Sequence, residues 1–325
     1  MNEGAVLGID GGGSKTLIAL ADGTGQVFRI ARGEPTNPLD NSAWQDVLEA
    51  QMRPLIRQAD LRGVAAALPA YGEVEEISSA QRRTIAAVAG AVPNLVLNDV
   101  DAAHLGAFAG GPGILILSGT GSMAWARDPA GRSFRVGGWG DVIGDEGSSH
   151  WIGQRVLGAV SQSLDGRGIP TALVDALLTQ LRIDPAKPMN GLEGWVSRLD
   201  RPRSQIAALA PLATRLAAAS DPAALAIVGQ AADELARHIT AIAKFAGLPP
   251  VWSYAGGTFH SPVLRDMVAA RVGTPASPPR LPPVGGALLA AAQHLDWHID
   301  DAWIERLATS IQAMPAKTTE LQPIN

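Results

Sequence analysis

The chain has 325 residues, no cysteine and a net charge of −5. This length predicts two domains, since one domain commonly takes about 150 residues. The lack of cysteine excludes disulfides, thiolate metal sites, cysteine-held iron–sulfur clusters and cysteine nucleophiles, and an acidic balance without a dense Lys/Arg cluster argues against a nucleic-acid surface.

The first part of the chain predicts three strands joined by tight turns, followed by alternating helices and strands. We expect strands over residues 5–10, 16–21 and 26–31, where apolar residues are bounded by glycine-rich turns. A helix follows from an N-cap at Ser42 to about residue 60, and Pro54 can introduce a kink in it. We then expect a strand over 64–68, a helix over 78–89, a strand over 95–97 and a helix over 102–109.

The pattern of three strands then starts again. We expect strands over 113–117, 123–127 and 132–136, a helix over 147–163, a helical insertion over about 165–220 and a long helix over 222–246. A strand over 251–254 and helices over 261–270, 285–295 and 301–313 follow. The repeated order of elements indicates a structural duplication. We therefore predict an α/β fold with two lobes, each a mixed sheet with a three-strand meander plus helices, and a cleft between them.

The expected lobes span residues 1–112 and 113–297, with a C-terminal helix at about 298–325 packing back on the first lobe. No apolar run approaches the roughly 18 residues that cross a bilayer. The first residues show neither the basic nor the apolar region of a signal peptide. A cytoplasmic location without membrane contact is the resulting expectation.

A run of glycines after the first expected strand is the strongest local signal. Residues 10–16 read Asp-Gly-Gly-Gly-Ser-Lys-Thr. The glycines let backbone N–H groups approach a phosphate, and Asp10, at a strand end, is placed to hold a hydrated magnesium ion. A P-loop or a dinucleotide motif does not fit, because a strand rather than a helix follows the glycines. The alternative is a glycine-rich hairpin turn with no ligand.

A second loop of small residues, Ser118–Ser122, lies at the matching place in the second half, between its first two strands. One such loop is weak evidence for a phosphate site. Two loops at equivalent points of a duplicated unit favour a triphosphate that is held from both sides, over two turns without ligand.

Two aspartates, Asp99 and Asp101, follow the strand expected over residues 95–97. Phosphoryl transfer to an alcohol needs a carboxylate that takes the proton of the accepting hydroxyl, and a strand end facing the cleft would hold that group rigidly. Either aspartate can instead cap the following helix. One of the two can be the cap and the other the base, and the residues alone leave the choice between Asp99 and Asp101 open.

Residues 137–147 combine glycines with one tryptophan and three acids, in the order Gly-Gly-Trp-Gly-Asp-Val-Ile-Gly-Asp-Glu-Gly. Carboxylates can accept hydrogen bonds from pairs of sugar hydroxyls, a flat aromatic face can pack on the ring, and glycine allows close backbone approach. A second interpretation stays open: a flexible loop before a helix, with Asp145 or Glu146 near the helix N-terminus.

Together these motifs resemble the N-acetylglucosamine kinase branch of the BadF/BadG-type ATPase family, within the superfamily of sugar kinases, heat-shock ATPases and actin. The resemblance runs nearly end to end, and it implies two lobes of the actin-like, ribonuclease H-like ATPase fold. Its specific parts are residues 10–16, Thr36-Asn37, Asn98-Asp99, residues 118–122, 137–140 and 144–147, and the turn Gly256-Gly257, which resembles one that contacts adenosine.

The resemblance implies a role for each motif. ATP and Mg²⁺ are the implied cofactors, Asp10 lies near the metal through water, and Asp99 is the base for the 6-hydroxyl that attacks the γ-phosphate. The implied ATP-binding residues are Gly11, Gly12, Gly13, Ser14, Lys15, Thr16, Gly119, Thr120, Gly121, Ser122, Gly256 and Gly257. The implied sugar-binding residues are Asn37, Asp99, Gly138, Trp139, Gly140 and Asp145.

The function implied by the resemblance is ATP-dependent phosphorylation of an amino sugar, in the first place N-acetylglucosamine, by a homodimer. Residues 68–73 depart from the loop of animal members, which is richer in small and acidic residues, and this leaves the C2 substituent open. Glucosamine and N-acetylmuramic acid are the alternative substrates, and a sugar-sensing ATPase switch is the alternative class. Some family members transfer electrons through a cysteine-held iron–sulfur cluster. This role is excluded here, because the chain has no cysteine.

Overall fold

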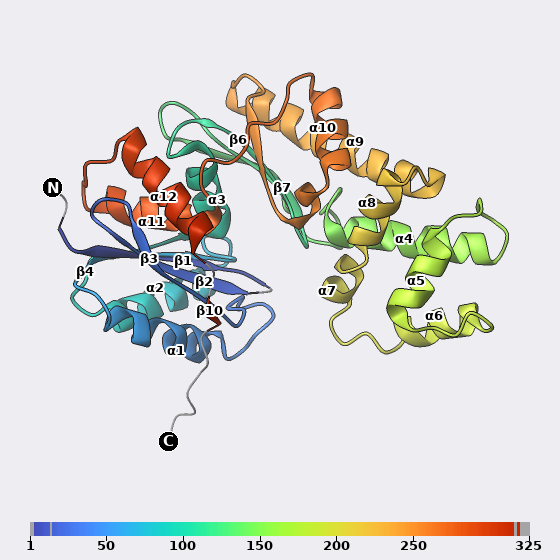
Figure 1. Cartoon of the computed structure of the whole chain (residues 1–325), viewed down its shortest axis with the longest axis horizontal. Helices are drawn as coiled ribbons and strands as arrows, with labels where there is room; N and C mark the ends of the chain where they lie inside the picture. The colour runs from blue at the N-terminus through green and yellow to red at the C-terminus, as the bar shows by residue number, and fades with distance from the viewer. Residues whose placement is uncertain (1–2, 14, 315–316, 319–325) are drawn as a thin grey trace. The chain divides into compact units, whose positions relative to one another are not determined.

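The computed structural model describes residues 3–13, 15–314 and, for the backbone alone, 317–318. The chain divides into two compact units (Figure 1). The first unit combines Met1–Gly111 with Pro278–Asn325, and the second is Pro112–Ser277. The chain therefore leaves the first unit once and returns to it.

The first unit is built on a six-stranded sheet with the order β10-β3-β2-β1-β4-β5. β1 pairs antiparallel with β2 and parallel with β4, and β5 continues the parallel part. The strands are β1 (Ala5–Gly11), β2 (Thr16–Asp22), β3 (Val27–Gly33), β4 (Leu61–Leu68), β5 (Asn94–Asn98) and β10 (Lys317–Thr318). The carboxyl ends of β1, β4 and β5 consequently share one edge of the sheet.

Helices cover both faces of this sheet. The helices α1 (Trp44–Ile56) and α2 (Glu75–Ala89) pack on one face, and α3 (Asp99–Phe108), α11 (Pro283–His294) and α12 (Asp301–Ala313) on the other (Figure 1). Side chains alternate along β1, so Leu7 joins the core under α1 and α2 while Val6 joins the core under α11.

The start of α1 differs from the expectation. Ser42 was expected as the N-cap, but Ala43 occupies that position and makes no side-chain cap. The Oδ1 atom of Asn41 accepts from the backbone N–H of Ala43 at 2.9 Å. The asparagine side chain thus closes the turn locally, which is a common behaviour of this residue type.

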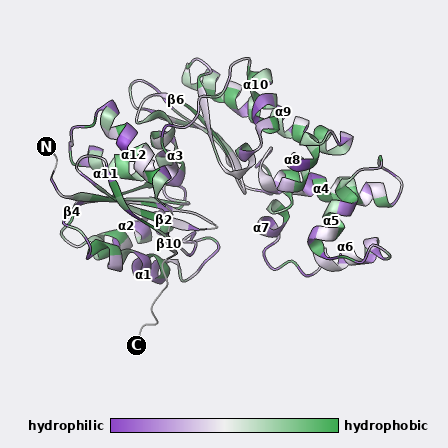
Figure 2. Ribbon diagram, viewed as in Figure 1, coloured by the Kyte–Doolittle hydropathy of each residue, from purple (hydrophilic) through white to green (hydrophobic). Residues whose placement is uncertain are grey.

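Helix α11 packs in the first unit, whereas the sequence placed these residues in the second lobe. A Cβ on Gly8 of β1 would lie 2.7 Å from the backbone nitrogen of Leu288, and a Cβ on Gly286 would lie 1.8 Å from the carbonyl oxygen of Ala102 in α3. Glycine at both contacts lets α11 lie directly on β1 and α3. Figure 2 shows that α11 is hydrophobic over most of its length, as this position requires.

The boundary expected after residue 297 is therefore corrected, and the second unit ends at Ser277. The C-terminal helix α12 also lies in the first unit. Its Ser310 Oγ accepts a hydrogen bond from the backbone N–H of Val27 in β3 at 3.0 Å. Asp300 caps α12 by accepting from the backbone N–H of Trp303 at 2.8 Å.

The second unit is built on a four-stranded sheet with the order β8-β7-β6-β9. Its strands are β6 (Gly113–Ser118), β7 (Ser122–Arg127), β8 (Ser133–Gly137) and β9 (Trp252–Ala255). β6 pairs antiparallel with β7 and parallel with β9. Numbered within each unit, both sheets contain the order 3-2-1-4, so the structural duplication predicted from the sequence is confirmed.

The helices of the second unit enclose one core with this sheet. They are α4 (Ser149–Leu164), α5 (Leu173–Leu181), α6 (Pro188–Val196), α7 (Pro202–Ala207), α8 (Ala210–Ala218), α9 (Pro222–Ala246), the 3-10 helix η1 (Gly257–His260) and α10 (Pro262–Val272). Asp221 caps α9 and also accepts from Thr171 Oγ1 at 2.8 Å, which ties the insertion to α9. No helix in the described part of the chain is long and apolar enough to cross a membrane.

Candidate functional site

The aspartates predicted to act in chemistry lie together at the carboxyl edge of the first sheet. Asp10 is opposite Ala67 of β4, and Ala67 is opposite Leu97 of β5. Asp99 follows two residues after Leu97, as the first residue of α3. Both aspartates are half-buried. The parallel pairing of three strands therefore brings two carboxylates, which are far apart in the sequence, to one edge.

Burial gives both carboxylates unusual proton affinities. Burial raises the pKa of Asp10 to about 7; the charge of Asp99 adds to the rise and that of Lys15 opposes it. Burial also raises the pKa of Asp99 to about 6. A hydrogen bond from the backbone N–H of Val100 lowers this pKa in part, and the charge of Glu73 raises it further. A carboxylate whose pKa lies near neutrality is a better proton acceptor than an ordinary aspartate.

The helix-capping role that competed with the base role belongs to another residue. Asn98 is the N-cap of α3, and its Oδ1 accepts from the backbone N–H of Val100 at 2.9 Å while its Nδ2 donates to the carbonyl oxygen of Tyr71 at 2.8 Å. Asp99 Oδ1 also accepts from Val100 N at 2.9 Å. Asp101 lies two residues further along the helix, about 200° around its axis from Asp99. These contacts favour Asp99 over Asp101 as the base.

The first glycine loop lies against the segment that contains Thr36 and Asn37. A Cβ on Gly11 would lie 2.7 Å from Thr36 Oγ1, and Thr36 N donates to the carbonyl oxygen of Gly12 at 3.3 Å. Thr16 is fully buried and its Oγ1 lies 3.0 Å from that of Thr36. The Thr16 hydroxyl therefore shapes the loop, and the predicted contact of Thr16 with ATP stays a prediction.

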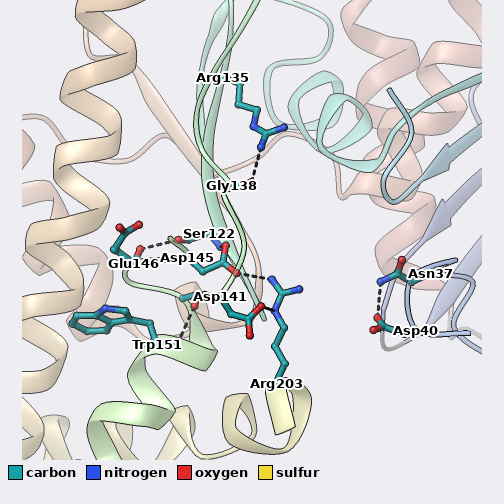
Figure 3. A network of polar contacts seen from close by, with 11 residues as sticks. Asn37, Asp40, Ser122, Arg135, Gly138, Asp141, Asp145, Glu146, Trp151 and Arg203 are labelled. Atoms are coloured by element: carbon teal, nitrogen blue, oxygen red, sulfur yellow. Dashed lines mark hydrogen bonds and ion pairs between the residues drawn. The ribbon is translucent and has the colours of Figure 1, made fainter. Parts of the chain in front are cut away.

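Other residues of this loop remain available to a ligand. Gly13 and Lys15 are exposed, and Gly12 is half-buried. Ser14, predicted to contact phosphate, lies outside the described residues. Asn37, predicted to bind sugar, donates through Nδ2 to Asp40 Oδ2 at 2.5 Å (Figure 3). This bond gives Asn37 a defined orientation beside the glycine loop.

The second loop is held by its two serines. Ser118 Oγ donates to the carbonyl oxygen of Gly147 at 2.8 Å, and Ser122 Oγ donates to that of Glu146 at 2.7 Å. The backbone N–H of Ser149, at the start of α4, donates to the carbonyl oxygen of Gly119 at 2.7 Å. The Ser122 hydroxyl is buried and engaged within the protein, and the predicted contact of Ser122 with ATP stays a prediction. Thr120, at the tip, is exposed.

The turn Gly256-Gly257 adjoins this loop, as a common nucleotide site requires. A Cβ on Gly256, whose φ is +98°, would lie 2.1 Å from the carbonyl oxygen of Ser118. Thr258 Oγ1 donates to the same oxygen at 2.6 Å. Only glycine fits at position 256, because both the backbone conformation and the closeness of β6 exclude a side chain.

The predicted sugar-binding loop, residues 137–147, follows β8 and exposes its tryptophan. Trp139 is 69% exposed, and the guanidinium of Arg135 lies 5.8 Å from its ring centroid. Arg135 also donates through Nη2 to the carbonyl oxygen of Gly138 at 2.5 Å (Figure 3). Gly138 and Gly140 both have positive φ. An exposed aromatic face beside free backbone groups is a suitable platform for a sugar ring.

Asp145 is the one predicted sugar-binding residue of this loop that is buried, with 3% exposure. Its backbone has a φ of +60°, in the left-handed region that aspartate and asparagine enter more often than most other non-glycine residues. Its Oδ1 accepts from the backbone N–H of Ser122 at 3.1 Å, and Arg203 Nη2 lies 2.5 Å from its Oδ2 (Figure 3). A buried carboxylate with two donors is a rigid group.

Sequence reasoning missed Arg203. It lies in α7 of the helical insertion, 58 positions after Asp145, and its Nε is also 3.6 Å from Asp141 Oδ1. An arginine among polar residues of a helical insertion carries no pattern that predicts this pairing. Only the packing of α7 against α4 brings Arg203 to the acidic loop, residues 137–147.

The residues at the sheet edge fit the predicted magnesium ion. No group of three or more His, Asp or Glu side chains in the described ranges is arranged to hold a metal. Mg²⁺ commonly keeps several waters and takes one or two carboxylates besides substrate phosphates. Asp10 and Asp99 offer oxygen ligands, and a cation would offset both the burial and the charge of Asp99, which together raise the pKa of Asp10.

A comparison with protein families identifies one match over most of the chain. The BadF/BadG/BcrA/BcrD ATPase family matches residues 7–291. This range contains every residue assigned above to phosphate, sugar or metal binding.

Two curated relatives are similar to the chain over most of their length. An N-acetylmuramic acid/N-acetylglucosamine kinase of Clostridium acetobutylicum is 29% identical over 267 residues, which cover 79% of this chain and 86% of the relative. An N-acetyl-D-glucosamine kinase of Dictyostelium discoideum is 26% identical over 300 residues, which cover 84% of this chain and 91% of the relative.

A solved structure has the same fold. A protein of Chromobacterium violaceum, provisionally assigned as an N-acetylglucosamine kinase, superimposes with a TM-score of 0.70 at 28% identity, covering 88% of this chain and 98% of that chain. The expected fold class, two α/β lobes built on mixed sheets, is confirmed by this similarity and by the matching strand orders of the two units.

Proposed function

Since the chain belongs to the BadF/BadG/BcrA/BcrD ATPase family, we propose that it is an ATP-dependent kinase of amino sugars. N-acetylglucosamine is the proposed first substrate and N-acetylglucosamine 6-phosphate the product. The relatives that bear kinase names for this sugar support the proposal.

The observation that carries the proposal is the pair of carboxylates at the edge of the first sheet, beside the glycine loop. Asp99 stands at the N-terminus of α3 with a raised pKa of about 6. The glycine loop connects β1 and β2 directly after Asp10. A proton acceptor, a metal-binding carboxylate and a backbone phosphate cradle are the three groups that phosphoryl transfer to an alcohol needs.

In the proposed reaction, the 6-hydroxyl oxygen of the sugar attacks the γ-phosphorus of ATP. The bond from this phosphorus to the β–γ bridging oxygen breaks, and ADP leaves with that electron pair. Asp99 accepts the hydroxyl proton and orients the attacking oxygen. General-base assistance of this kind typically contributes about 10²–10⁴ in rate.

Backbone N–H groups of both glycine loops are proposed to bind the ATP phosphates, with the side chains of Lys15 and Thr120 adding donors. Both side chains belong to exposed residues. Gly256 and Gly257 are proposed to lie against the adenosine, because their turn adjoins the second glycine loop, where Thr258 Oγ1 donates to the carbonyl oxygen of Ser118 at 2.6 Å. Asp10 would hold Mg²⁺ through water, and the ion would neutralise charge on the phosphates.

The sugar is proposed to bind to the loop of residues 137–147. The Trp139 face would contact the ring, Gly138 and Gly140 would offer backbone groups, and Asp145 would accept from ring hydroxyls. Asp145 Oδ1 and Oδ2 each carry one protein donor. Each carboxylate oxygen can accept a further hydrogen bond, so the contacts to the protein do not exhaust its capacity as an acceptor.

N-acetylmuramic acid is the second candidate substrate, because the relative from Clostridium acetobutylicum carries this name as well as that of N-acetylglucosamine. Glucosamine and a sugar-sensing ATPase switch remain the further alternatives. A homodimer, a cytoplasmic location and a cleft that closes on the substrates stay predictions.

The test is ADP release by the purified protein with Mg²⁺ and ATP, in the presence of each of five sugars: N-acetylglucosamine, N-acetylmuramic acid, glucosamine, N-acetylmannosamine and glucose. A kinase releases ADP in proportion to added sugar, and mass spectrometry finds the sugar phosphate. N-acetylglucosamine is expected to give the highest kcat/KM. Slow ATP hydrolysis at the same rate with every sugar would refute the kinase proposal in favour of a switch.

A further inference from the structure

The ion pair between Arg203 and Asp145 joins the helical insertion to the acidic loop. Arg203 Nη2 lies 2.5 Å from Asp145 Oδ2, and the exposed fractions of the two side chains are 43% and 4% (Figure 3). The arginine therefore keeps solvent on one side while it covers the carboxylate. Asp141, the second acid that it contacts, lies 3.6 Å from its Nε.

A buried carboxylate needs this partner. Removing a carboxylate from water is costly unless charge and hydrogen bonds replace its hydration. Besides Arg203, the backbone N–H of Ser122 donates to the Asp145 carboxylate. Asp145 also carries a left-handed backbone, which holds only where its surroundings determine it. Without Arg203, the carboxylate would turn toward water and the loop would lose its present conformation.

The glycine at position 121 leaves the space that the Arg203–Asp145 ion pair occupies. A Cβ on Gly121 would lie 2.8 Å from Arg203 Nη2 and 2.8 Å from Asp145 Oδ1. The second glycine loop thus leaves just enough room for the ion pair. His150, at the start of α4, is buried nearby, and its pKa is lowered by burial and also by the charge of Arg203.

We infer that Arg203 is a positioning residue of the sugar site, acting through Asp145 and bringing the helical insertion into that site. This inference rests on the proposed function, in which Asp145 accepts hydrogen bonds from the sugar. Arg203 itself contacts no reacting atom. Its effect is to hold the carboxylate oxygens where the sugar hydroxyls reach them.

The test compares three variants with the wild type in the ADP-release assay. Arg203→Gln removes the charge, Arg203→Lys keeps the charge but loses the planar fork, and Arg201→Gln is the matched control. Arg201 is exposed at the N-cap of the same helix, and its backbone N–H donates to Asp200 Oδ1 and Gln205 Oε1.

The expected result is a change in sugar KM. Arg203→Gln should raise KM for the sugar at least about tenfold, because truncating one member of a buried charge pair leaves the other unpaired. KM for ATP should change less than about threefold, because the bonds of Ser118 and Ser149 to the neighbouring loop remain. Arg203→Lys should recover part of the loss, and Arg201→Gln should match the wild type within about twofold.

A double variant decides whether Arg203 acts through Asp145. In an Asp145→Asn background, Arg203→Gln should add less than about a threefold change in kcat/KM, since the carboxylate that it positions is gone. Full additivity of the two losses would overturn the inference, and so would a wild-type sugar KM in Arg203→Gln. Equal rises in both KM values together with a lowered Tm would show general damage to the lobe, and would also overturn it. A wild type that phosphorylates no sugar would instead overturn the proposed function.

Discussion

Replacing Asp99 by asparagine is expected to remove activity and, at the same time, to stabilise the ligand-free protein. The pKa of this carboxyl is raised from 3.8 to about 6, chiefly by burial. The folded state therefore binds the proton more tightly than the unfolded chain does. The stability that the protonated group contributes is fully present below pH 3.8 and is lost as the pH rises through about 6.

The magnitude follows from the size of the shift. About two pKa units at 1.36 kcal/mol each correspond to a cost of up to about 3 kcal/mol for the ionised carboxylate at pH 8. Asparagine is neutral and can still accept the hydrogen bond that Val100 N donates to Asp99 Oδ1 at 2.9 Å. Loss of the charge also favours ionisation of Asp10, whose pKa Asp99 raises. Asp99→Asn should therefore raise the free energy of unfolding at pH 8 and leave it nearly unchanged at pH 4.

The assay is thermal unfolding of the wild type and Asp99→Asn at pH 4 and pH 8, without nucleotide and with a chelator. At pH 8 the variant should melt up to roughly 10 °C higher, since a domain of this size gains about 2–4 °C per kcal/mol. Its kcat should fall at least about a hundredfold, with little change in sugar affinity.

The matched control is Asp101→Asn, which changes the same residue type in the same helix. A variant Asp99→Asn that is nearly as active as the wild type, together with an inactive Asp101→Asn, would transfer the base role to Asp101. An Asp99→Asn protein no more stable than the wild type at pH 8 would refute the electrostatic part of the reasoning.

Three further predictions follow from the structure. The wild-type kcat/KM for sugar should rise with pH through about 6, because Asp99 must lose its proton to act as base; a pH–rate profile that is flat from pH 5 to 8 would contradict this. Gly121→Ala should lower kcat/KM at least about tenfold in steady-state kinetics, because its Cβ would meet Asp145 and Arg203 at 2.8 Å. Gly286→Ala should lower the free energy of unfolding by about 3 kcal/mol or more in urea titrations, because its Cβ would lie 1.8 Å from a backbone oxygen of α3, whereas Gly229→Ala in α9, whose Cβ would make an ordinary contact 3.6 Å from Arg271 Nη2, should be neutral or stabilising.

Local signals predicted the individual elements well. α9 was expected over residues 222–246 and occupies them, because Asp221 and Pro222 mark its start and Gly247, with a φ of +65°, ends it. The meander of each lobe was also visible from its turns. Ser42 was a wrong cap because Asn41, one residue earlier, offered the same kind of oxygen to the backbone.

The site was only partly visible in the sequence. Glycine loops and strand-end aspartates have a local pattern, so their chemistry could be predicted before any fold was known. The hydrogen-bond partners of Thr16 and Ser122 could not be predicted from the sequence. The direction of a hydroxyl depends on neighbours that are distant in the chain, here Thr36 and Glu146. The choice of Asn98 as the cap of α3 is a further example, since the sequence favoured Asp99 or Asp101 for that role.

The sequence by itself determined the order of elements, the duplication and the residue types that chemistry needs, because strand alternation, turns and caps depend on neighbours along the chain. The tertiary structure decided which distant segments meet. It placed α11 with β1 and α3 in the first unit, and it brought Arg203 to Asp145. Those contacts depend on close approach and on the replacement of lost hydration, and both arise only once the chain has folded.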